Sequence, residues 1–463
     1  MNNYIETTYK FLPIFLQNVA LSIYGYFWKR RRFGGIFKVQ LLEFSHRENY
    51  SKSDWYDYQT QELRRLLKHS FTNVPYYRKK YTEAGFNLHD LKHFELTDLK
   101  NLPYLEKEDL RKYGTSSLLS DNKGKGSFIS SSGSTGTPTS IFFTKSFHQE
   151  WSAVYELRVR NWAGVNYNMR RGMIGGRKII PDALATPPYY RYNYFERQTY
   201  FSAYHLSPKT VADYMNGLKR NKVEYLVGYA MSLYFWADFI NNDSSIEPIK
   251  LKAVLTSSEK LTNEMRAVIE KAFTCKVFDA YSGVEACGLI SENEFGELLF
   301  SPDTGILEII DGVGEYVVDG EVGEVCSTGF LNYDQPLIRY RIGDRVKLSS
   351  SQSSKSNLEF PIIEEIEGRL EDVVIGADGR KMVRFHSLFI DVNGLKSAQI
   401  VQHEIDFVEI KLIIEDCYSK NSERIISERL TSQLGPIQIK YNYVNKIPLT
   451  NSGKFKAVIS NIS

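Results

Sequence analysis

The sequence predicts an α/β protein with a large N-terminal domain, residues 1–370, and a small α+β C-terminal domain, residues 371–463. Three observations support this fold class. Strands alternate with helices between residues 173 and 281, which favours parallel sheets with helices on their faces. Residues 298–348 alternate apolar and polar side chains between glycine turns, which is typical of an antiparallel, barrel-like β region. The residues after 371 are too few for more than a small unit.

Length and composition indicate a soluble globular protein with more than one subdomain. At 463 residues the chain is too long for one ordinary core. Hydrophobic residues make up 42% of it and charged residues 24%, the proportions of an ordinary soluble protein. The formal net charge of +3 is close to balance, so nucleic acid is not an expected partner.

The four cysteines, Cys275, Cys287, Cys326 and Cys417, favour a reducing compartment. None forms a Cys-x-x-Cys pair and the histidines are scattered, so no cysteine-rich metal site is expected. Reduced thiols are typical of cytosolic proteins, and we expect a cytoplasmic location.

Residues 1–50 are expected to form a helical segment that packs on the large domain. Residues 11–28 are rich in apolar side chains, and Lys29-Arg30-Arg31-Arg32 follows them. Pro13 and polar residues interrupt the apolar run, so it falls short of a membrane-spanning helix. No small-residue cleavage site follows, so no signal peptide is expected. The alternative is a helix at the inner face of the membrane, with residues 11–32 in peripheral contact with anionic lipid.

Hydrophobic periodicity places the regular elements in chain order. We expect helices at 56–68, from Ser146 with that serine as the N-cap, and at 208–221, 231–240 and 262–273. We expect strands at 173–176, 225–229, 251–256 and 276–281. Parallel sheets bind ligands at the carboxyl ends of their strands, and polar motifs fall at these ends.

The segment 130–138 combines hydroxyl side chains with two glycines, Gly133 and Gly136. Apolar runs at 128–129 and 141–144 flank it, so we expect a strand–loop–strand turn. Glycine lets the backbone approach a ligand closely, and successive N–H groups can form an anion-binding nest. The segment is therefore a candidate phosphate loop, without the Gly-Lys-Ser/Thr ending of a Walker A loop. A flexible Ser/Gly linker is the alternative interpretation.

Four further motifs follow the candidate phosphate loop along the chain. They are Asp279-Ala280-Tyr281-Ser282-Gly283-Val284-Glu285, Arg339-Tyr340-Arg341-Ile342-Gly343-Asp344, Gly368-Arg369-Leu370-Glu371-Asp372 and Pro448-Leu449-Thr450-Asn451-Ser452-Gly453-Lys454. Their order and spacing resemble the adenylate-forming superfamily of acyl-CoA synthetases, firefly luciferase and peptide-synthetase adenylation domains. Within it the chain resembles the phenylacetate–CoA ligase branch, and in particular the CapK-type proteins of surface-polysaccharide gene clusters. Each motif alone is weakly specific, whereas five in this order are strongly specific.

The resemblance implies both an architecture and an activity. The architecture is a large adenylate-forming domain of parallel α/β sheets plus a barrel-like region, with a small mobile lid. The activity is that of an ATP-dependent ligase, which joins a carboxylate to the α-phosphate of ATP, releases pyrophosphate and transfers the acyl group to an acceptor. ATP and Mg²⁺ would be required, with CoA as a further cofactor only where CoA is the acceptor, and bacterial capsule or O-antigen biosynthesis is the implied setting.

The resemblance assigns the candidate phosphate loop to the β- and γ-phosphates of ATP. The residues so assigned are Ser131, Ser132, Gly133, Ser134, Thr135, Gly136 and Thr137. Relatives often have a lysine just after the proline of this loop, whereas Thr139 stands there in this chain. This difference leaves less positive charge on the departing pyrophosphate.

The second motif would hold the metal and the base. Glu285 would bind Mg²⁺, a hard cation that prefers oxygen ligands. Tyr281 would stack on the adenine, and Asp279 would face the base. The other residues that the resemblance places on the nucleotide are Ala280, Ser282, Ser258 and Glu259. Relatives usually have threonine or serine where this chain has Val284, and that hydroxyl contacts the α-phosphate. In this chain Ser282 or Ser258 would supply the hydroxyl instead. A plain strand-to-helix cap is the alternative for the segment around Ser258.

The remaining motifs would complete the nucleotide site and close it. Asp344 would accept hydrogen bonds from the ribose hydroxyls, and Arg369 would reach ribose or phosphate with its rigid fork of donors. Lys454 would swing onto the α-phosphate and the carboxylate only when the lid is closed, which also removes water. The pivot of the lid would be Glu371 or Asp372.

Three residues are candidates for the acyl pocket. His205 falls where relatives place an aromatic residue or a histidine beside the acyl carboxylate, and a buried structural histidine is the alternative. Tyr229 and Trp236 either line the acyl pocket or belong to the core.

The acceptor is left open by the sequence. CoA is the usual acceptor in the wider family, but residues 373–380 favour a hairpin where CoA ligases place a short glycine-bearing loop along the pantetheine tunnel. An amine on a sugar or an amino acid is therefore the alternative acceptor. A second alternative is a non-catalytic scaffold at the membrane, against which the presence of Lys454, Glu285 and Asp344 argues.

Overall fold

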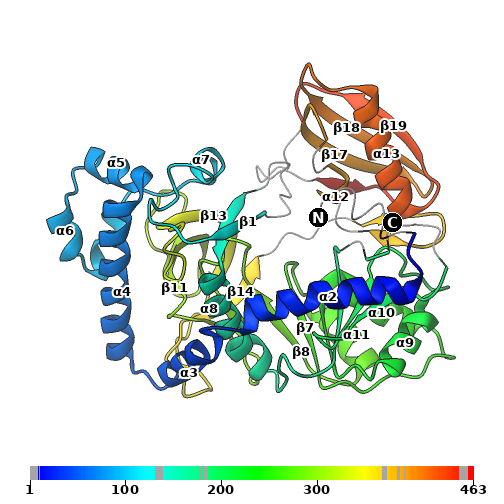
Figure 1. The fold of residues 1–463 in the computed structure, drawn as a ribbon, viewed down its shortest axis with the longest axis horizontal. Helices are drawn as coiled ribbons and strands as arrows, with labels where there is room; N and C mark the ends of the chain where they lie inside the picture. The colour runs from blue at the N-terminus through cyan, green and yellow to red at the C-terminus, as the bar shows by residue number, and fades with distance from the viewer. Residues whose placement is uncertain are drawn as a thin grey trace.

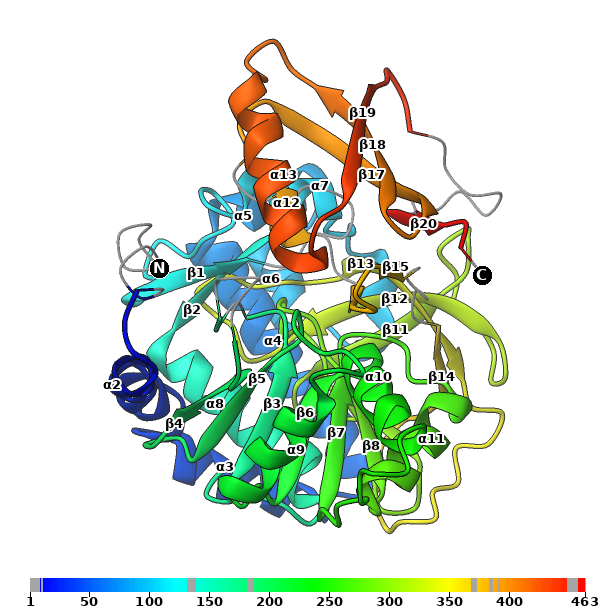
Figure 2. The same ribbon diagram turned by 90° about the vertical axis from the view of Figure 1, so that its right-hand side faces the viewer.

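The computed structural model describes residue 9 and residues 11–130, 139–177, 179–180, 186–367, 373–382, 386–389, 392–447 and 457–462. Figure 1 shows a large body, which contains helices α2 to α11, and a smaller unit above it formed by the last part of the chain. Turned by 90°, Figure 2 shows the small unit over one end of the strands of the large body.

Helices contribute most of the first half of the large body. They are α2 (Ile14–Phe33), α3 (Phe37–Arg47), α4 (Lys52–Asn73), α5 (Pro75–Glu83), α6 (Leu88–Lys92), the 3₁₀-helix η1 (Leu96–Asn101), α7 (Lys107–Tyr113), α8 (Lys145–Tyr155) and the π-helix η2 (Glu156–Asn161). Helix α4 confirms the expected helix and extends it at both ends. Ser51 and Asp54 form a capping box at its start, and Pro75 favours its end at Asn73.

One sheet of twelve strands runs through the large body. Its strands are β3 (Arg171–Gly175), β4 (Tyr190–Asn193), β5 (Gln198–Ser202), β6 (Tyr225–Tyr229), β7 (Ala253–Ser257), β8 (Val277–Tyr281), β9 (Ile290–Glu292), β10 (Leu298–Phe300), β11 (Gly305–Ile310), β12 (Val322–Gly329), β13 (Tyr340–Leu348) and β14 (Ile362–Glu367). Their spatial order is β11-β12-β13-β14-β10-β9-β8-β7-β6-β3-β5-β4. The pairs from β5 through β3, β6 and β7 to β8 are parallel.

Helices cover both faces of the parallel strands, as the α/β class predicts. Neighbouring residues of β6 and β7 point to opposite faces, since side chains alternate along a strand. Tyr225 and Leu255 pack with the N-terminal helices, whereas Leu226 and Val254 pack beneath α9 (Val211–Arg220), α10 (Ala230–Asn241) and α11 (Asn263–Phe273). The expected alternation of strands and helices between residues 173 and 281 is confirmed.

The strands after residue 298 pair antiparallel, as expected. They continue the same sheet, because β9 pairs antiparallel with β8 on one side and β10 on the other. A further strand, β14, lies between β10 and β13. The β-rich region is thus joined edge to edge with the parallel strands.

The predicted N-cap at Ser146 is wrong by two residues. Helix α8 begins at Lys145, and Thr144 is its N-cap, with its hydroxyl accepting from the N–H of Phe147 at 3.4 Å. Thr144 still has extended backbone angles as the last residue of strand β2 (Ser140–Thr144), which is the conformation that an N-cap needs.

The small unit has its own sheet and core. The strands are β17 (Leu395–Glu404), β18 (Phe407–Ile414), β19 (Gln438–Tyr443) and β20 (Val458–Ser460), in the order β19-β18-β17-β20. Helix α13 (Lys420–Leu434) packs Ile426, Leu430 and Leu434 on this sheet, and the short helix α12 (His386–Phe389) adds Leu388. The expected hairpin is present as β15 (Val374–Ile375) and β16 (Lys381–Met382).

Candidate active site

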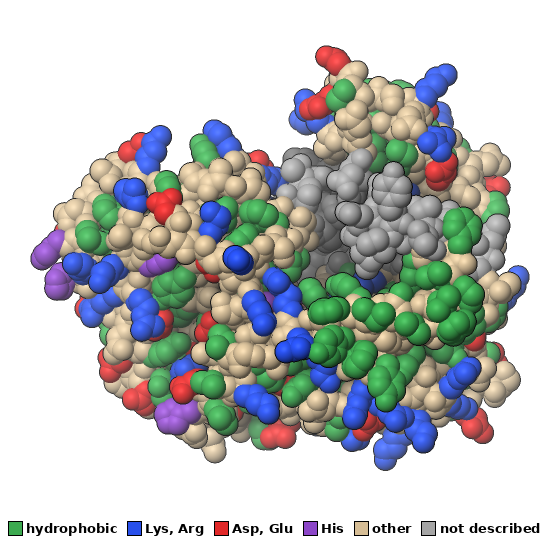
Figure 3. Space-filling view, in the orientation of Figure 1, with side chains coloured by type: hydrophobic (Ala, Val, Ile, Leu, Met, Phe, Trp, Pro, Cys, Tyr) green, Lys and Arg blue, Asp and Glu red, His purple; other side chains and the backbone are tan. Residues whose placement is uncertain are grey.

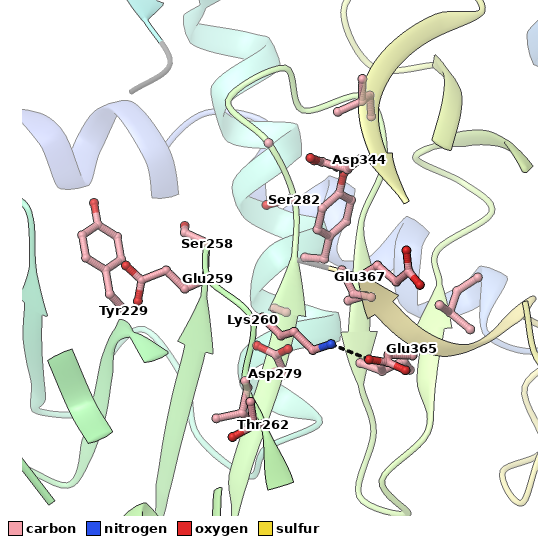
Figure 4. A pocket seen from close by; sticks show the side chains of 18 of the residues that line it. Tyr229, Ser258, Glu259, Lys260, Thr262, Asp279, Ser282, Asp344, Glu365 and Glu367 are labelled. Atoms are coloured by element: carbon pink, nitrogen blue, oxygen red, sulfur yellow. Dashed lines mark hydrogen bonds and ion pairs between the residues drawn. The ribbon is translucent and has the colours of Figure 1, made fainter. Parts of the chain in front are cut away.

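A cavity of about 1320 Å³ lies where the large sheet meets the small unit. The ends of β7 and β8 and parts of β13 and β14 form its walls on one side, and residues 395–398 and Val458 of the small unit form part of the other. Figure 4 shows side chains from these strands converging on the space, among them Ser258, Asp279, Ser282 and Asp344. The cavity is at the carboxyl ends of parallel strands, where α/β sheets bind their ligands.

The candidate phosphate loop begins and ends beside this cavity. Strands β1 (Gly126–Ser130) and β2 (Ser140–Thr144) pair antiparallel, with the hydroxyls of Ser130 and Ser140 3.1 Å apart. Ser130 lines the cavity. The expected strand–loop–strand arrangement is therefore confirmed at its flanks. Residues 131–138 lie outside the described residues, so the phosphate-binding roles of Ser131 to Thr137 stay predictions.

Glu285 is buried at the cavity wall and is held in place by two hydroxyls. Its Oε1 accepts a hydrogen bond from Thr139 Oγ1 at 3.1 Å and from Tyr340 OH at 3.3 Å. Burial and the neighbouring carboxylate raise the pKa of Tyr340, so the phenol stays a donor. A Cβ on Gly283 would lie 2.4 Å from Glu285 Oε2, so glycine leaves the room that this carboxylate occupies.

This arrangement fits Mg²⁺ better than a metal held by protein alone. Among the residues that the structure describes, no cluster of three or more His, Cys, Asp or Glu side chains could hold a metal ion. Mg²⁺ usually takes one or two carboxylates and completes its shell with water and substrate phosphates. The single oriented carboxylate of Glu285, next to the base of the candidate phosphate loop, matches that pattern.

Tyr281 and Asp344 meet across the cavity wall. Tyr281 ends β8, Asp344 lies on β13, and the phenol donates to Asp344 Oδ2 at 2.8 Å. Burial raises the pKa of Tyr281 well above its ordinary value, and Asp344 adds to the shift. The phenol therefore remains protonated and fixes the orientation of the carboxylate. Two residues that the sequence assigned to adenine and ribose are thus in direct contact.

Asp279 lies deeper along the same strand and faces the cavity. Its Oδ1 accepts from Thr256 Oγ1 at 2.7 Å, and its N–H donates to Glu292 Oε2 at 2.8 Å. Burial raises the pKa of Asp279 to about 6. Ala280 and Ser282, the other predicted residues of this motif, also line the cavity.

The segment after β7 combines a cavity wall with a helix cap. Ser258 has φ of +70°, a left-handed conformation that a side chain rarely adopts, and it lines the cavity. Glu259 Oε2 accepts from the N–H of Met231 at 2.9 Å, which caps the start of α10. Thr262 caps α11 by accepting from the N–H of Met265 at 3.2 Å. The cap of the helix after β7 is thus Thr262, and Glu259 binds the start of the preceding helix; the adenine contact of Ser258 and Glu259 stays a prediction.

Sequence reasoning missed several contacts of the cavity. The sequence gives no sign that Thr139 and Tyr340 bind Glu285, yet both donate hydrogen bonds to it. Lys260 Nζ pairs with Glu365 Oε1 at 2.5 Å and joins the α11 side of the cavity to β14, as the dashed line in Figure 4 shows. No local signal reports such pairs, because the partners are far apart in the chain.

The candidate acyl-pocket residues have different surroundings. His205 is buried, its Nδ1 lies 2.7 Å from Ser202 Oγ, and its ring stacks on Tyr189 at 5.1 Å. It is not among the described residues that line the cavity, so its catalytic role stays a prediction. Trp236, a residue of α10, is fully buried in the core, whereas Tyr229 lines the cavity. Arg369 and Lys454 lie outside the described residues, and their roles also stay predictions.

Comparison with curated proteins confirms the resemblance that the motifs predict. A family model described as the CapK C-terminal domain matches residues 374–461. Protein CapK of Staphylococcus aureus is 29% identical over 478 residues, which cover 100% of this chain and 100% of that protein. Phenylacetate-coenzyme A ligase of Pseudomonas putida is 28% identical over 342 residues, which cover 69% of this chain and 71% of the ligase.

Solved structures confirm the fold. A 2-hydroxyisobutyryl-CoA ligase in complex with 2-HIB-AMP and CoA in the thioesterification state has a TM-score of 0.56 at 19% identity, covering 90% of this chain and 91% of that chain. An open conformation of that ligase has a TM-score of 0.54 at 18% identity, covering 89% and 93%. At such identities the likeness bears on the fold alone, and it matches the α/β class expected from the sequence.

Proposed function

We propose that this adenylate-forming, CapK-type chain is an ATP-dependent ligase that activates a carboxylate as its acyl-adenylate and passes the acyl group to an acceptor. One observation carries the proposal. Tyr281 and Glu285, from one motif, and Asp344, from a motif about sixty residues later, meet at one cavity that the small unit also lines. The activities named for its relatives, phenylacetate–CoA ligases among them, agree with this assignment.

The main obstacle in adenylation is the repulsion between a carboxylate and a triphosphate. An enzyme lowers this barrier by neutralising charge and by aligning the reactants. Mg²⁺ held at Glu285 would supply positive charge beside the phosphates. Thr139 and Tyr340 fix that carboxylate, so the group that would hold Mg²⁺ is oriented before ATP binds.

Asp344, oriented by Tyr281, would hold the ribose, and the Tyr281 ring would lie against the adenine. An oxygen of the substrate carboxylate then attacks the α-phosphorus of ATP. The bond between that phosphorus and the pyrophosphate oxygen breaks, and pyrophosphate leaves as an anion. Lys454 would stabilise the charge on the α-phosphate in that transition state. Arg369 would contribute a second, fixed positive charge at the ribose or phosphate.

The acceptor in our proposal is an amine or CoA, and we expect residues of the small unit to determine which of the two is bound. The match to the phenylacetate–CoA ligase leaves about three tenths of this chain unpaired, whereas the match to CapK covers all of it, and the CapK C-terminal model falls on residues 374–461. The β15–β16 hairpin lies in that region. The hairpin supports an amine as an alternative to CoA, and the match to CapK supports capsule or O-antigen biosynthesis in the cytoplasm as the setting.

The test is carboxylate-dependent release of pyrophosphate from ATP. A panel of aromatic, hydroxy- and amino-sugar carboxylates is offered with Mg²⁺, and the products formed on adding CoA, amino sugars or amino acids are identified by mass spectrometry as thioester or amide. In Lys454→Ala we expect release to be lost while ATP affinity is nearly unchanged, because this lysine acts only in the transition state. Lys440→Ala, an exposed lysine on the same unit, is the control.

Two results would overturn the proposal. Wild-type rates of pyrophosphate release in Lys454→Ala would remove this lysine from the reaction. ATP binding without release for any carboxylate would favour the scaffold alternative. Contact with a membrane surface through residues 11–32 is a separate proposal, which rests on the exposed side of helix α2.

A further inference from the structure

The first half of helix α2 turns polar side chains toward the protein. Gln17 is buried and its Oε1 accepts from Arg191 Nε. Asn18 Oδ1 accepts from the N–H of Tyr192 at 2.9 Å, and Ser22 Oγ accepts from the N–H of Tyr194 at 3.0 Å. The expectation that this helix packs on the large domain is confirmed, but an amphipathic helix in water ordinarily buries its apolar side.

The reason for the reversal lies in the sheet that α2 covers. Strand β4 is the last strand of the twelve, and its partner β5 lies on one side only. Its other edge presents backbone N–H groups, which need acceptors. The side chains of Asn18 and Ser22, one helical turn apart, supply acceptors to alternate residues of this edge.

The C-terminal end of α2 is fixed in the same way. Arg32 forms an ion pair with the buried Glu196, and Arg31 donates from Nη2 to the carbonyl of Phe143 at 2.8 Å and from Nε to His148 Nδ1 at 3.1 Å. These contacts fix the rotation of the helix about its axis. The apolar side is therefore held outward by many polar bonds and is not exposed by chance.

The outward side is a continuous apolar stripe. Phe15, Val19, Ile23 and Phe27 follow one another at intervals of four residues, with exposed fractions of 65%, 48%, 54% and 66%. Helix α3, the next element of the chain, exposes two more apolar side chains, Val39 and Leu42, at 58% and 71%. We call these six residues the outer stripe. In Figure 3 hydrophobic side chains gather along α2, and this is a large apolar patch for a protein surface.

Along helix α2 the charged residues of the outer stripe's border are all positive. Between Phe11 and Leu42 the chain has no Asp or Glu, whereas it has Lys29, Arg30, Arg31, Arg32 and Lys38. Arg30 and Lys38 are exposed next to the stripe. A second protein surface would need matching acidic groups, whereas the headgroups of an anionic bilayer supply negative charge everywhere along the border.

The length and the amphipathic character of helix α2 indicate its orientation on a bilayer. No helix in the part of the chain that the structure describes is long and apolar enough to cross a membrane. A helix with an apolar side and a basic border lies in the interface plane, with its apolar side among the acyl chains. Tyr26, Tyr194 and Phe195 stand beside the stripe, and amphipathic aromatic rings favour that depth.

We propose that the outer stripe and its basic border dock this protein in plane on a bilayer that contains anionic phospholipid. The polar side of α2 stays on strand β4 in the bound state, so docking needs no unfolding of the large body. The catalytic cavity is a separate part of the surface, and the proposal does not depend on which carboxylate or acceptor is used.

Co-sedimentation with vesicles tests this. The full chain is mixed with vesicles of phosphatidylcholine alone, or with about a third of the lipid replaced by phosphatidylglycerol, at low and at high salt. We expect binding to the anionic vesicles that weakens with salt. The double variant Val19→Glu/Ile23→Glu should lower the affinity at least about tenfold, because two charges would enter the acyl region. Arg30→Glu/Lys38→Glu should lower it on anionic vesicles only.

The control is Val313→Glu/Val318→Glu, which places the same charges at residues 85% and 65% exposed on the connection between β11 and β12. Circular dichroism and pyrophosphate release without vesicles check that each variant is folded and active. Failure of wild type to bind anionic vesicles, or equal binding by the stripe variant and the control, would overturn the proposal. So would a dimer in light scattering that Val19→Glu/Ile23→Glu separates, since the stripe would then cover a second copy.

Discussion

At the scale of single residues, the contact between Tyr281 and Asp344 leads to a direct prediction about ATP affinity. Asp344→Ala removes a carboxylate that we assign to the ribose, and we expect ATP affinity to fall by about 1.5–3 kcal/mol, the range for hydrogen bonds to a charged group. Tyr281→Phe keeps the ring and removes only the bond at 2.8 Å, so we expect a loss of about 0.5–1.5 kcal/mol.

Titration calorimetry with ATP and with AMP measures both changes. Asp319→Ala, an exposed carboxylate on the connection between β11 and β12, is the control. An unchanged affinity in a folded Asp344→Ala protein would remove this residue from the site.

The buried carboxyl of Asp279 should make the stability of the folded protein depend on pH. Burial raises the pKa of its carboxyl from the ordinary 3.8 to about 6. The folded state therefore binds this proton more tightly than the unfolded state, so the free energy of unfolding falls as pH rises from about 4 to above about 6. Asp279→Asn cannot ionise and still accepts from Thr256, so it should lose less stability over this interval.

Urea unfolding of both proteins at pH values on either side of this interval measures the difference. We expect the stability of the Asn variant, relative to wild type, to grow with pH and to level off above about 6. A constant difference across the interval would show that Asp279 does not titrate there.

Part of the site was predictable at this scale, and part was not. Tyr281, Asp344 and Glu285 were assigned from motifs, because each motif carries an unusual residue in a fixed order. The bonds from Thr139 and Tyr340 to Glu285 were not predicted, because they join three segments that only the folded sheet brings together. His205 was predicted beside the substrate, and its position near Ser202 and Tyr189 is set by packing that no local pattern encodes.

At the scale of elements, Gly25 tests how closely α2 must approach strand β4. A Cβ at Gly25 would lie 2.0 Å from the amide nitrogen of Asn193, whose side chain is buried and bonded to Glu196. We expect Gly25→Ala to lower the free energy of unfolding by about 1–3 kcal/mol, the usual cost of overpacking. Chemical denaturation followed by circular dichroism measures it.

Gly312→Ala is the matched control, since a Cβ there would meet nothing within 4 Å. Alanine in place of glycine at an open position is neutral or slightly stabilising. Equal effects of the two substitutions would mean that α2 does not pack tightly at Asn193.

Helix and strand positions were largely predictable, whereas the orientation of α2 was not. The strand at 225–229 and the helix after Thr262 were found as expected, because their periodicity is strong and their ends carry turn or cap residues. The apolar run at 11–28 predicted a helix, but not that its polar side would face the protein. That choice depends on the open edge of β4, an element far along the chain.

At the scale of the whole molecule, the cavity is shared by the large sheet and the small unit, so movement of that unit should matter for each half-reaction. Adenylation and acyl transfer should need different positions of the small unit, pivoting at Glu371 or Asp372. Proline fixes φ near −65°. Glu371→Pro should therefore favour one position and slow one half-reaction far more than the other, by about tenfold or more.

Rapid-quench measurement of adenylate formation and of its consumption by acceptor gives the two rates. Glu371→Ala, which removes the side chain without fixing φ, is the control. An equal fall in both rates, or no fall in either, would mean that this segment is only a connection between domains.

The arrangement of β4 beneath α2 has a practical consequence for handling the protein. The helix covers that sheet edge, and its outer stripe is where a detergent micelle would bind. A detergent that pulls α2 away would uncover a strand ready to pair with the same strand of another molecule. Purification in strong detergent, or removal of the first 33 residues to improve solubility, should therefore produce β-sheet aggregates instead of a better-behaved monomer.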